Sequence, residues 1–117
     1  MKATERVSAW FESGRIVRPS ENETNIVDAI RALGLLAGAP ISDPGPGVAG
    51  LVREIGEHEH YLFVLIDGAG ARQVEALSDD SFLRRNRVRD MQTVFLTTTS
   101  SVLTTLSTGR WPCEHGV

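Results

Sequence analysis

In the first half of the chain, apolar residues recur every three or four positions, which is the spacing of an amphipathic helix. This spacing predicts one helix over residues 4–13 and another over residues 48–55. Between them a third helix should carry the apolar residues Ile26, Val27, Ile30 and Leu33, with Asn22 or Thr24 as its N-cap, and it should end near Gly34 or Gly38. The first half is therefore expected to be mainly helical.

In the second half, residues 61–66 form an unbroken apolar run, and residues 91–96 form a second, shorter apolar segment that should be the next strand. Such continuous runs are typical of strands that are buried on both faces of a parallel sheet. A helical pattern follows each segment, so this half should pair its strands in parallel through a right-handed crossover. We therefore expect an α/β fold with a parallel sheet and helices on both of its faces.

A single domain is the simplest division of a chain of 117 residues. Residues 1–47 should form mainly a helical arm and a loop, because residues 40–47 are rich in proline and glycine. Residues 48–117 should form the α/β half, which carries the candidate chemistry. No internal repeat is visible in the sequence.

The first apolar run ends in Asp67, which is followed by Gly68 and Gly70. Functional groups of parallel sheets gather at the carboxyl ends of the strands. A carboxylate that is buried there must be paired or bound to a metal. Asp67 is therefore a candidate metal ligand, although an aspartate before a glycine is also common in turns.

The second apolar run leads into a cluster of hydroxyl residues at the start of a helical pattern. A hydroxyl at this place can cap the helix, or it can act as a nucleophile where the helix dipole favours a phosphate. Thr97, Thr98, Ser100 and Ser101 compete with Thr99 for these two roles.

Three motifs in this half share their order and spacing with a known family. They are Ile-Asp-Gly at residues 66–68, Phe-Leu-Thr-Thr-Thr at residues 95–99, and Thr-Gly-Arg-Trp-Pro-Cys-Glu-His-Gly-Val at residues 108–117. Together they resemble the alkaline phosphatase superfamily, and its nucleotide pyrophosphatase/phosphodiesterase branch in particular. Leu96 stands where that branch usually has proline, which affects the local turn more than the chemistry.

The resemblance implies a metal-dependent phosphoric-ester hydrolase with a parallel-sheet α/β fold. Asp67 would bind metal, and Thr99 would be both the nucleophile and a metal ligand. The cofactors would be two divalent metal ions, with Zn²⁺ favoured, and the substrate would be a small phosphate ester or a nucleotide. The family's remaining metal ligands come later in its sequence, so we expect this chain to be an N-terminal fragment that is inactive alone.

Two alternatives remain open. A non-catalytic nucleotide-binding module would use Gly68 and Gly70, but the third glycine of the dinucleotide fingerprint is replaced by Gln73. A phosphomutase-type relative shares the Asp-Gly-x-Gly start and usually has a serine nucleophile. Bound metal would distinguish a hydrolase from the binding module.

Other reactive side chains have simpler interpretations. In the family that the chain resembles, the histidine at the position of His115 belongs to a structural turn. His58 and His60 could chelate a metal, but a solvated segment before the apolar run is the simpler interpretation. Cys113 has no second cysteine to pair with.

The net charge of −3 and the isoelectric point near 5.6 argue against a general nucleic-acid footprint, which would be basic. No apolar run reaches the length of a membrane span, and the first residues lack the apolar core of a signal peptide. We therefore expect a cytoplasmic location. The oligomeric state cannot be derived from the sequence.

Overall fold

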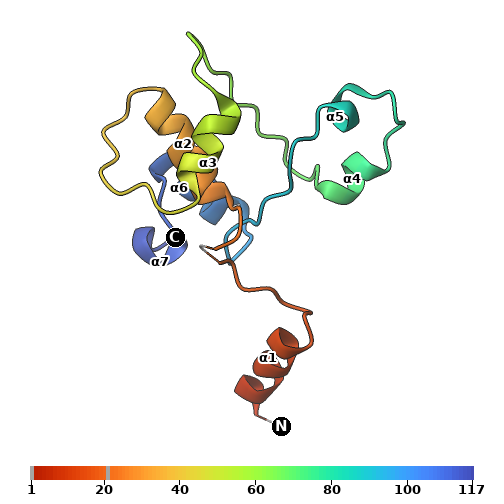
Figure 1. Cartoon of the computed structure of the whole chain (residues 1–117). Helices are drawn as coiled ribbons and strands as arrows, with labels where there is room; N and C mark the ends of the chain where they lie inside the picture. Colours follow the sequence, from red (N-terminus) through yellow and green to blue (C-terminus); the bar gives the residue numbers. More distant parts are fainter. Residues whose placement is uncertain (1, 21) are drawn as a thin grey trace.

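The computed structural model describes residues 2–20 and 22–117, which form helices joined by turns and extended segments (Figure 1). The helices are α1 (Ala3–Glu12), α2 (Ile26–Leu36), α3 (Val48–Ile55), α4 (Ala71–Glu75), α5 (Phe82–Arg85), α6 (Thr99–Thr108) and α7 (Pro112–His115). None of the helices in these residues combines the length and the apolar composition needed to cross a bilayer.

The small apolar core lies between α2 and α3, which pack against each other. Ala32, Val48 and Leu51 are its buried members, and partly buried aliphatic side chains of both helices surround them. Both helices had been predicted from apolar spacing, and α3 spans the predicted residues 48–55. These predictions are confirmed because the apolar stripe of each helix does face the core.

The N-cap of α2 is Asn25, so the predictions of Asn22 and Thr24 are wrong. Asn25 Oδ1 accepts a hydrogen bond from the backbone N–H of Asp28 at 2.9 Å. Asn25 Nδ2 donates to the Asp28 carboxylate, also at 2.9 Å. Both side chains are buried, so the start of α2 is fixed by a polar pair inside the molecule.

Arg31 joins α2 to the turn between α6 and α7. Its Nε donates to the Gly109 carbonyl at 2.7 Å, and its Nη1 donates to the Pro44 carbonyl at 3.3 Å. The guanidinium also lies 3.8 Å from the Glu114 carboxylate. This one side chain therefore holds the α2–α3 loop and the α6–α7 turn against the same helix.

Two parts of the chain lie outside this body. Figure 1 shows α1 at the end of an extended arm, and α1 contacts no other helix of the described residues. The second part contains α4 and α5, which contact each other and no other helix of the described residues. Near these helices the guanidinium of Arg87 donates hydrogen bonds to the carboxylates of Asp90 and Glu75. These hydrogen bonds raise the pKa of Arg87 above its usual value, and the bond to Asp90 has a larger effect than the bond to Glu75.

The prediction of a parallel-sheet α/β fold is wrong, because no sheet forms among residues 2–20 and 22–117. An isolated parallel β-bridge between Asn25 and Gln92 is the only β-pairing among the described residues. The segment 62–66 is extended, but its backbone makes no hydrogen bond to another described residue. An apolar run becomes a strand only where a neighbouring chain segment pairs with its N–H and C=O groups. The described residues offer no such neighbour to this segment.

A pair of glycine substitutions tests the packing of α3 against α2. A Cβ atom at Gly47 would collide with the carboxylate of Asp28, which Asn25 holds in place. A Cβ atom at Gly50, inside α3, would meet no atom within 4 Å. We expect Gly47→Ala to destabilise the α2–α3 pair by about 1–3 kcal/mol. Gly50→Ala should stabilise the pair by roughly 0.5–1 kcal/mol, because alanine favours the helix.

Amide hydrogen exchange in α2 and α3 measures both effects locally. Gly47 has a φ of −79°, so its backbone conformation suits alanine and any loss comes from the collision. Equal protection in the Gly47→Ala variant and the parent would contradict the close contact between Gly47 and Asp28.

Candidate functional site

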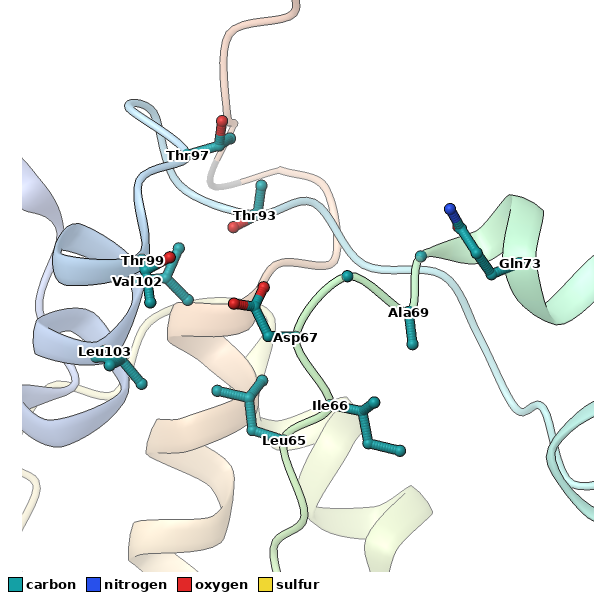
Figure 2. Close-up of a pocket in the computed structure, with 12 residues that line it drawn as sticks. Leu65, Ile66, Asp67, Ala69, Gln73, Thr93, Thr97, Thr99, Val102 and Leu103 are labelled. Carbon is teal, nitrogen blue, oxygen red and sulfur yellow. The ribbon is translucent and has the colours of Figure 1, made fainter.

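An open pocket of about 750 Å³ lies between the segment that contains Asp67 and the start of α6 (Figure 2). One wall comes from the extended segment 65–70 and from Gln73 of α4. The other wall comes from α6 and from the segment that leads into it. The residues that line these two walls are Leu65, Ile66, Asp67, Gly68, Ala69, Gly70, Gln73, Thr93, Thr97, Thr99, Val102 and Leu103.

Asp67 ends the extended apolar segment, and Gly68 turns the chain with a φ of +73°, which glycine adopts without strain. The side chain of Asp67 is exposed and makes no hydrogen bond or ion pair with any described residue. Figure 2 shows its carboxylate pointing into the space that Thr93 and Thr99 border. Both carboxylate oxygens are therefore available to a ligand.

The structure separates the roles of the clustered hydroxyl groups. Thr98 is the N-cap of α6, because its Oγ1 accepts a hydrogen bond from the backbone N–H of Ser101 at 3.4 Å. Ser101 is 3% exposed, and its own hydroxyl donates to the Val117 carbonyl at 2.6 Å. Thr97 and Thr99 line the pocket. Two of the four other candidates for the nucleophile, Thr98 and Ser101, thus have structural roles. Thr97 is the other candidate hydroxyl that lines the pocket with Thr99.

Thr99 is the first residue of α6, a helix of ten residues. The backbone N–H groups of Thr99 and Ser100 make no hydrogen bond to another described residue, as is usual in the first turn of a helix. These N–H groups carry the positive end of the helix dipole, which favours an anion. The pocket thus has a carboxylate on one wall and an anion-attracting helix end on the other.

His115 has structural partners, in line with its interpretation as part of a turn. Its Nε2 lies 3.0 Å from Thr105 Oγ1, and its Nδ1 accepts a hydrogen bond from the Val117 N–H at 3.1 Å. Gly109 and Gly116 end α6 and α7 with φ angles of +64° and +76°, which explains the two glycines of the motif.

The donors in the pocket fit part of a metal site. The Asp67 carboxylate and the Thr99 hydroxyl are oxygen donors, but a zinc site has about four ligands. Within residues 2–20 and 22–117 no three side chains of His, Cys, Asp or Glu gather closely enough to hold a metal. His58 instead lies 3.2 Å from the Ile55 carbonyl. The described residues therefore place two oxygen donors on the pocket wall, and they contain no complete set of metal ligands.

Most of the pocket wall around these two residues was not predicted from the sequence. Val102 and Leu103 line the pocket because they follow Thr99 at i+3 and i+4 on the same face of α6. That spacing could have been read from the sequence. Thr93 lies in an extended segment whose path depends on tertiary contacts, and no local signal placed it in the pocket.

Comparison with known proteins found no match among family profiles, curated proteins or solved structures.

Proposed function

We propose that Asp67 and Thr99 are part of the active site of a metal-dependent phosphoric-ester hydrolase, with Asp67 as a metal ligand and Thr99 as the nucleophile. One observation carries the proposal. These two residues come from separate segments of the chain, were singled out by their motifs, and line the same pocket.

The charges around the pocket support a role for metal. The N-terminus of α6 attracts a phosphate, whereas the carboxylate of Asp67 repels it. Both groups can act on the same phosphate only if a cation lies between the phosphate and Asp67. Carboxylate oxygen is a preferred ligand of divalent cations. A metal-free nucleotide site would leave the like charges of Asp67 and phosphate facing each other.

Each residue then has a defined task. Asp67 would hold the cation, and Thr99 Oγ1 would attack the phosphorus atom from the start of α6, losing its proton to solvent as the bond from phosphorus to the leaving alcohol oxygen breaks. Water would then hydrolyse the bond between phosphorus and Thr99 Oγ1, which restores the threonine and releases the phosphate product. The free N–H groups of Thr99 and Ser100 would donate to the phosphoryl oxygens. A threonine hydroxyl is a weak nucleophile, and a bound divalent metal supplies the charge that lowers its pKa. Because other ligands are needed, we expect turnover only where the site is complete.

Paramagnetic broadening with Mn²⁺ tests the metal site even when binding is weak. Mn²⁺ prefers oxygen donors, and it broadens the NMR signals of nearby nuclei. We expect Mn²⁺ to broaden the signals of Asp67, Gly68 and Thr99 first. Asp67→Asn should remove this effect and weaken Zn²⁺ binding roughly 10-fold or more, because an amide oxygen is a poorer ligand than a carboxylate.

Asp43→Asn is the matched control, because Asp43 is also an exposed loop aspartate and does not line the pocket. Broadening that is equal at all exposed carboxylates would contradict a site at Asp67. Broadening centred on residues 57–60 would favour the His-Glu segment as the chelator. A nucleotide that shifts the pocket signals without any metal would favour the nucleotide-binding module.

A further inference from the structure

The two sides of α6 have different surroundings. Thr99, Val102 and Leu103 line the pocket. Ser101 and Thr105, one turn apart on the other side of the helix, are 3% and 0% exposed. The rotation of α6 about its axis therefore determines both which side chains face the pocket and which face the body of the protein.

A closed chain of hydrogen bonds fixes the buried side. Ser101 Oγ donates to the carbonyl of Val117 at 2.6 Å, and the N–H of Val117 donates to His115 Nδ1 at 3.1 Å. His115 Nε2 then meets Thr105 Oγ1 at 3.0 Å. This series of hydrogen bonds starts at Ser101 of α6, passes through residues 115–117 and returns to α6 at Thr105, one turn after Ser101.

The tautomer of His115 follows from these contacts. Because Nδ1 accepts a hydrogen bond from the Val117 N–H, it carries no proton in this arrangement. The proton of the neutral imidazole is then on Nε2, which donates to Thr105 Oγ1. His115 thus bridges an N–H donor and a hydroxyl acceptor, and a side chain without both functions cannot replace it.

The side chain of Thr99 lacks such an anchor. Its hydroxyl makes no hydrogen bond with any described residue, and the side chain is exposed. Its direction is set by the backbone of the first turn of α6. That turn is held by the Thr98 cap and by the bond from Ser101 to Val117.

We propose that Ser101 and His115 are positioning residues for Thr99, because their hydrogen bonds through Val117 and Thr105 set the rotation of α6 that turns Thr99 toward the pocket. This inference rests on the proposed role of Thr99 as nucleophile. Residues 108–117 would then do more than end α6 and α7, because their hydrogen bonds would also hold the helix that carries the reacting hydroxyl.

Two substitutions in α6 form the first test. Thr105→Val keeps the shape of the side chain and removes the hydroxyl that meets His115. Thr104→Val makes the same change at the neighbouring residue, whose hydroxyl donates to the Ser100 carbonyl at 2.9 Å within the helix. The readout is the NMR signal of the Thr99 methyl group, identified by its absence in Thr99→Ser. We expect Thr105→Val to shift or split this signal by more than its linewidth and Thr104→Val to leave it in place.

A second pair tests the other end of the chain of bonds. Ser101→Ala removes the donor to Val117, whereas Ser107→Ala removes an exposed hydroxyl that donates to Leu103 within the same helix. We expect the Thr99 methyl signal to change in Ser101→Ala and to be unchanged in Ser107→Ala. If Ser101→Ala does not fold, the comparison of Thr105→Val with Thr104→Val still tests the proposal, because both substitutions conserve side-chain volume.

Two substitutions of His115 distinguish a positioning role from a contribution to overall stability. His115→Asn places an amide oxygen near the position of Nδ1, so it should retain the bond from Val117 but lose the contact with Thr105, and we expect it to shift the Thr99 signal less than His115→Ala does. His115→Ala should shift the signal as Ser101→Ala does. A Thr99 signal unchanged in folded Ser101→Ala and Thr105→Val variants would overturn the proposal. These measurements need no metal and no turnover, so their outcome is independent of whether Asp67 binds Zn²⁺.

Discussion

Thr99→Ala is expected to abolish metal-dependent hydrolysis of a chromogenic phosphodiester in any polypeptide in which the proposed metal site is complete. Loss of the nucleophile removes the covalent step, and in hydrolases such a loss lowers kcat by up to ~10⁶. We expect a decrease of roughly 10³-fold or more, with the metal content reduced but the fold retained. Initial rates at saturating Zn²⁺ measure the effect.

Thr97→Ala is the matched control, since Thr97 lines the same pocket and is the rival hydroxyl there. It should retain activity within a few-fold of the parent. If Thr97→Ala is inactive and Thr99→Ala is active, the nucleophile has been assigned to the wrong threonine. If both variants are active, neither hydroxyl attacks the phosphorus and the hydrolase mechanism proposed for the chain is wrong.

The same experiment with residues 1–117 alone should show no turnover, because Asp67 and Thr99 provide too few ligands for a two-metal site. Zinc-dependent turnover by this chain that is lost in Thr99→Ala would contradict that expectation. It would also mean that other residues of this chain complete the metal site.

The helices could be predicted because their information is local. The apolar stripe of α3 is read within one or two turns and lies where the sequence placed it. The cap of α6 is Thr98, one of the five hydroxyl residues that the sequence left open for this role. The N-cap of α2 was misplaced because several capping residues precede the helix. The pair of Asn25 with Asp28, three residues later, is the spacing that could have identified the cap.

The strands could not be predicted correctly because their existence depends on distant partners. The run over residues 61–66 has the composition of a buried strand, but composition does not supply the neighbouring backbone. The other predicted strand is paired at one position, where Gln92 exchanges hydrogen bonds with Thr24 and Ile26 at 2.8 and 3.0 Å. Asp67 and Thr99 nevertheless line the same pocket, although the parallel sheet that was expected to bring them together does not form.

The apolar segment is also the origin of the last prediction, which concerns stability. Leu62, Phe63 and Val64 are 90%, 50% and 65% exposed, and Leu65 and Ile66 are exposed as well. Among the described residues, the buried apolar side chains are Val27, Ala32, Val48, Leu51 and Val94. The free energy of unfolding of a small domain is only ~5–15 kcal/mol, so a core of this size leaves little reserve.

The dimensions of the chain lead to the same conclusion. Its radius of gyration is 16.2 Å, whereas a compact chain of this length has about 13 Å. Its accessible surface is 8690 Å², compared with roughly 6200 Å² for a compact protein of this mass. More surface therefore stays in contact with water than in an ordinary domain. Residues 1–117 expressed alone should show a broad thermal transition by circular dichroism and should aggregate through segment 62–66.

Val64→Lys tests the role of this segment, because a charge on an exposed extended segment opposes strand-to-strand association. We expect this variant to increase the monomer fraction in size-exclusion chromatography several-fold. Val17→Lys adds the same charge at a valine that is 62% exposed but lies outside the segment, and it should have little effect. Equal improvement by both variants would show that net charge, not the apolar segment, controls solubility. A monodisperse parent with a sharp cooperative melt would refute the prediction of low stability, because it would mean that the small α2–α3 core suffices.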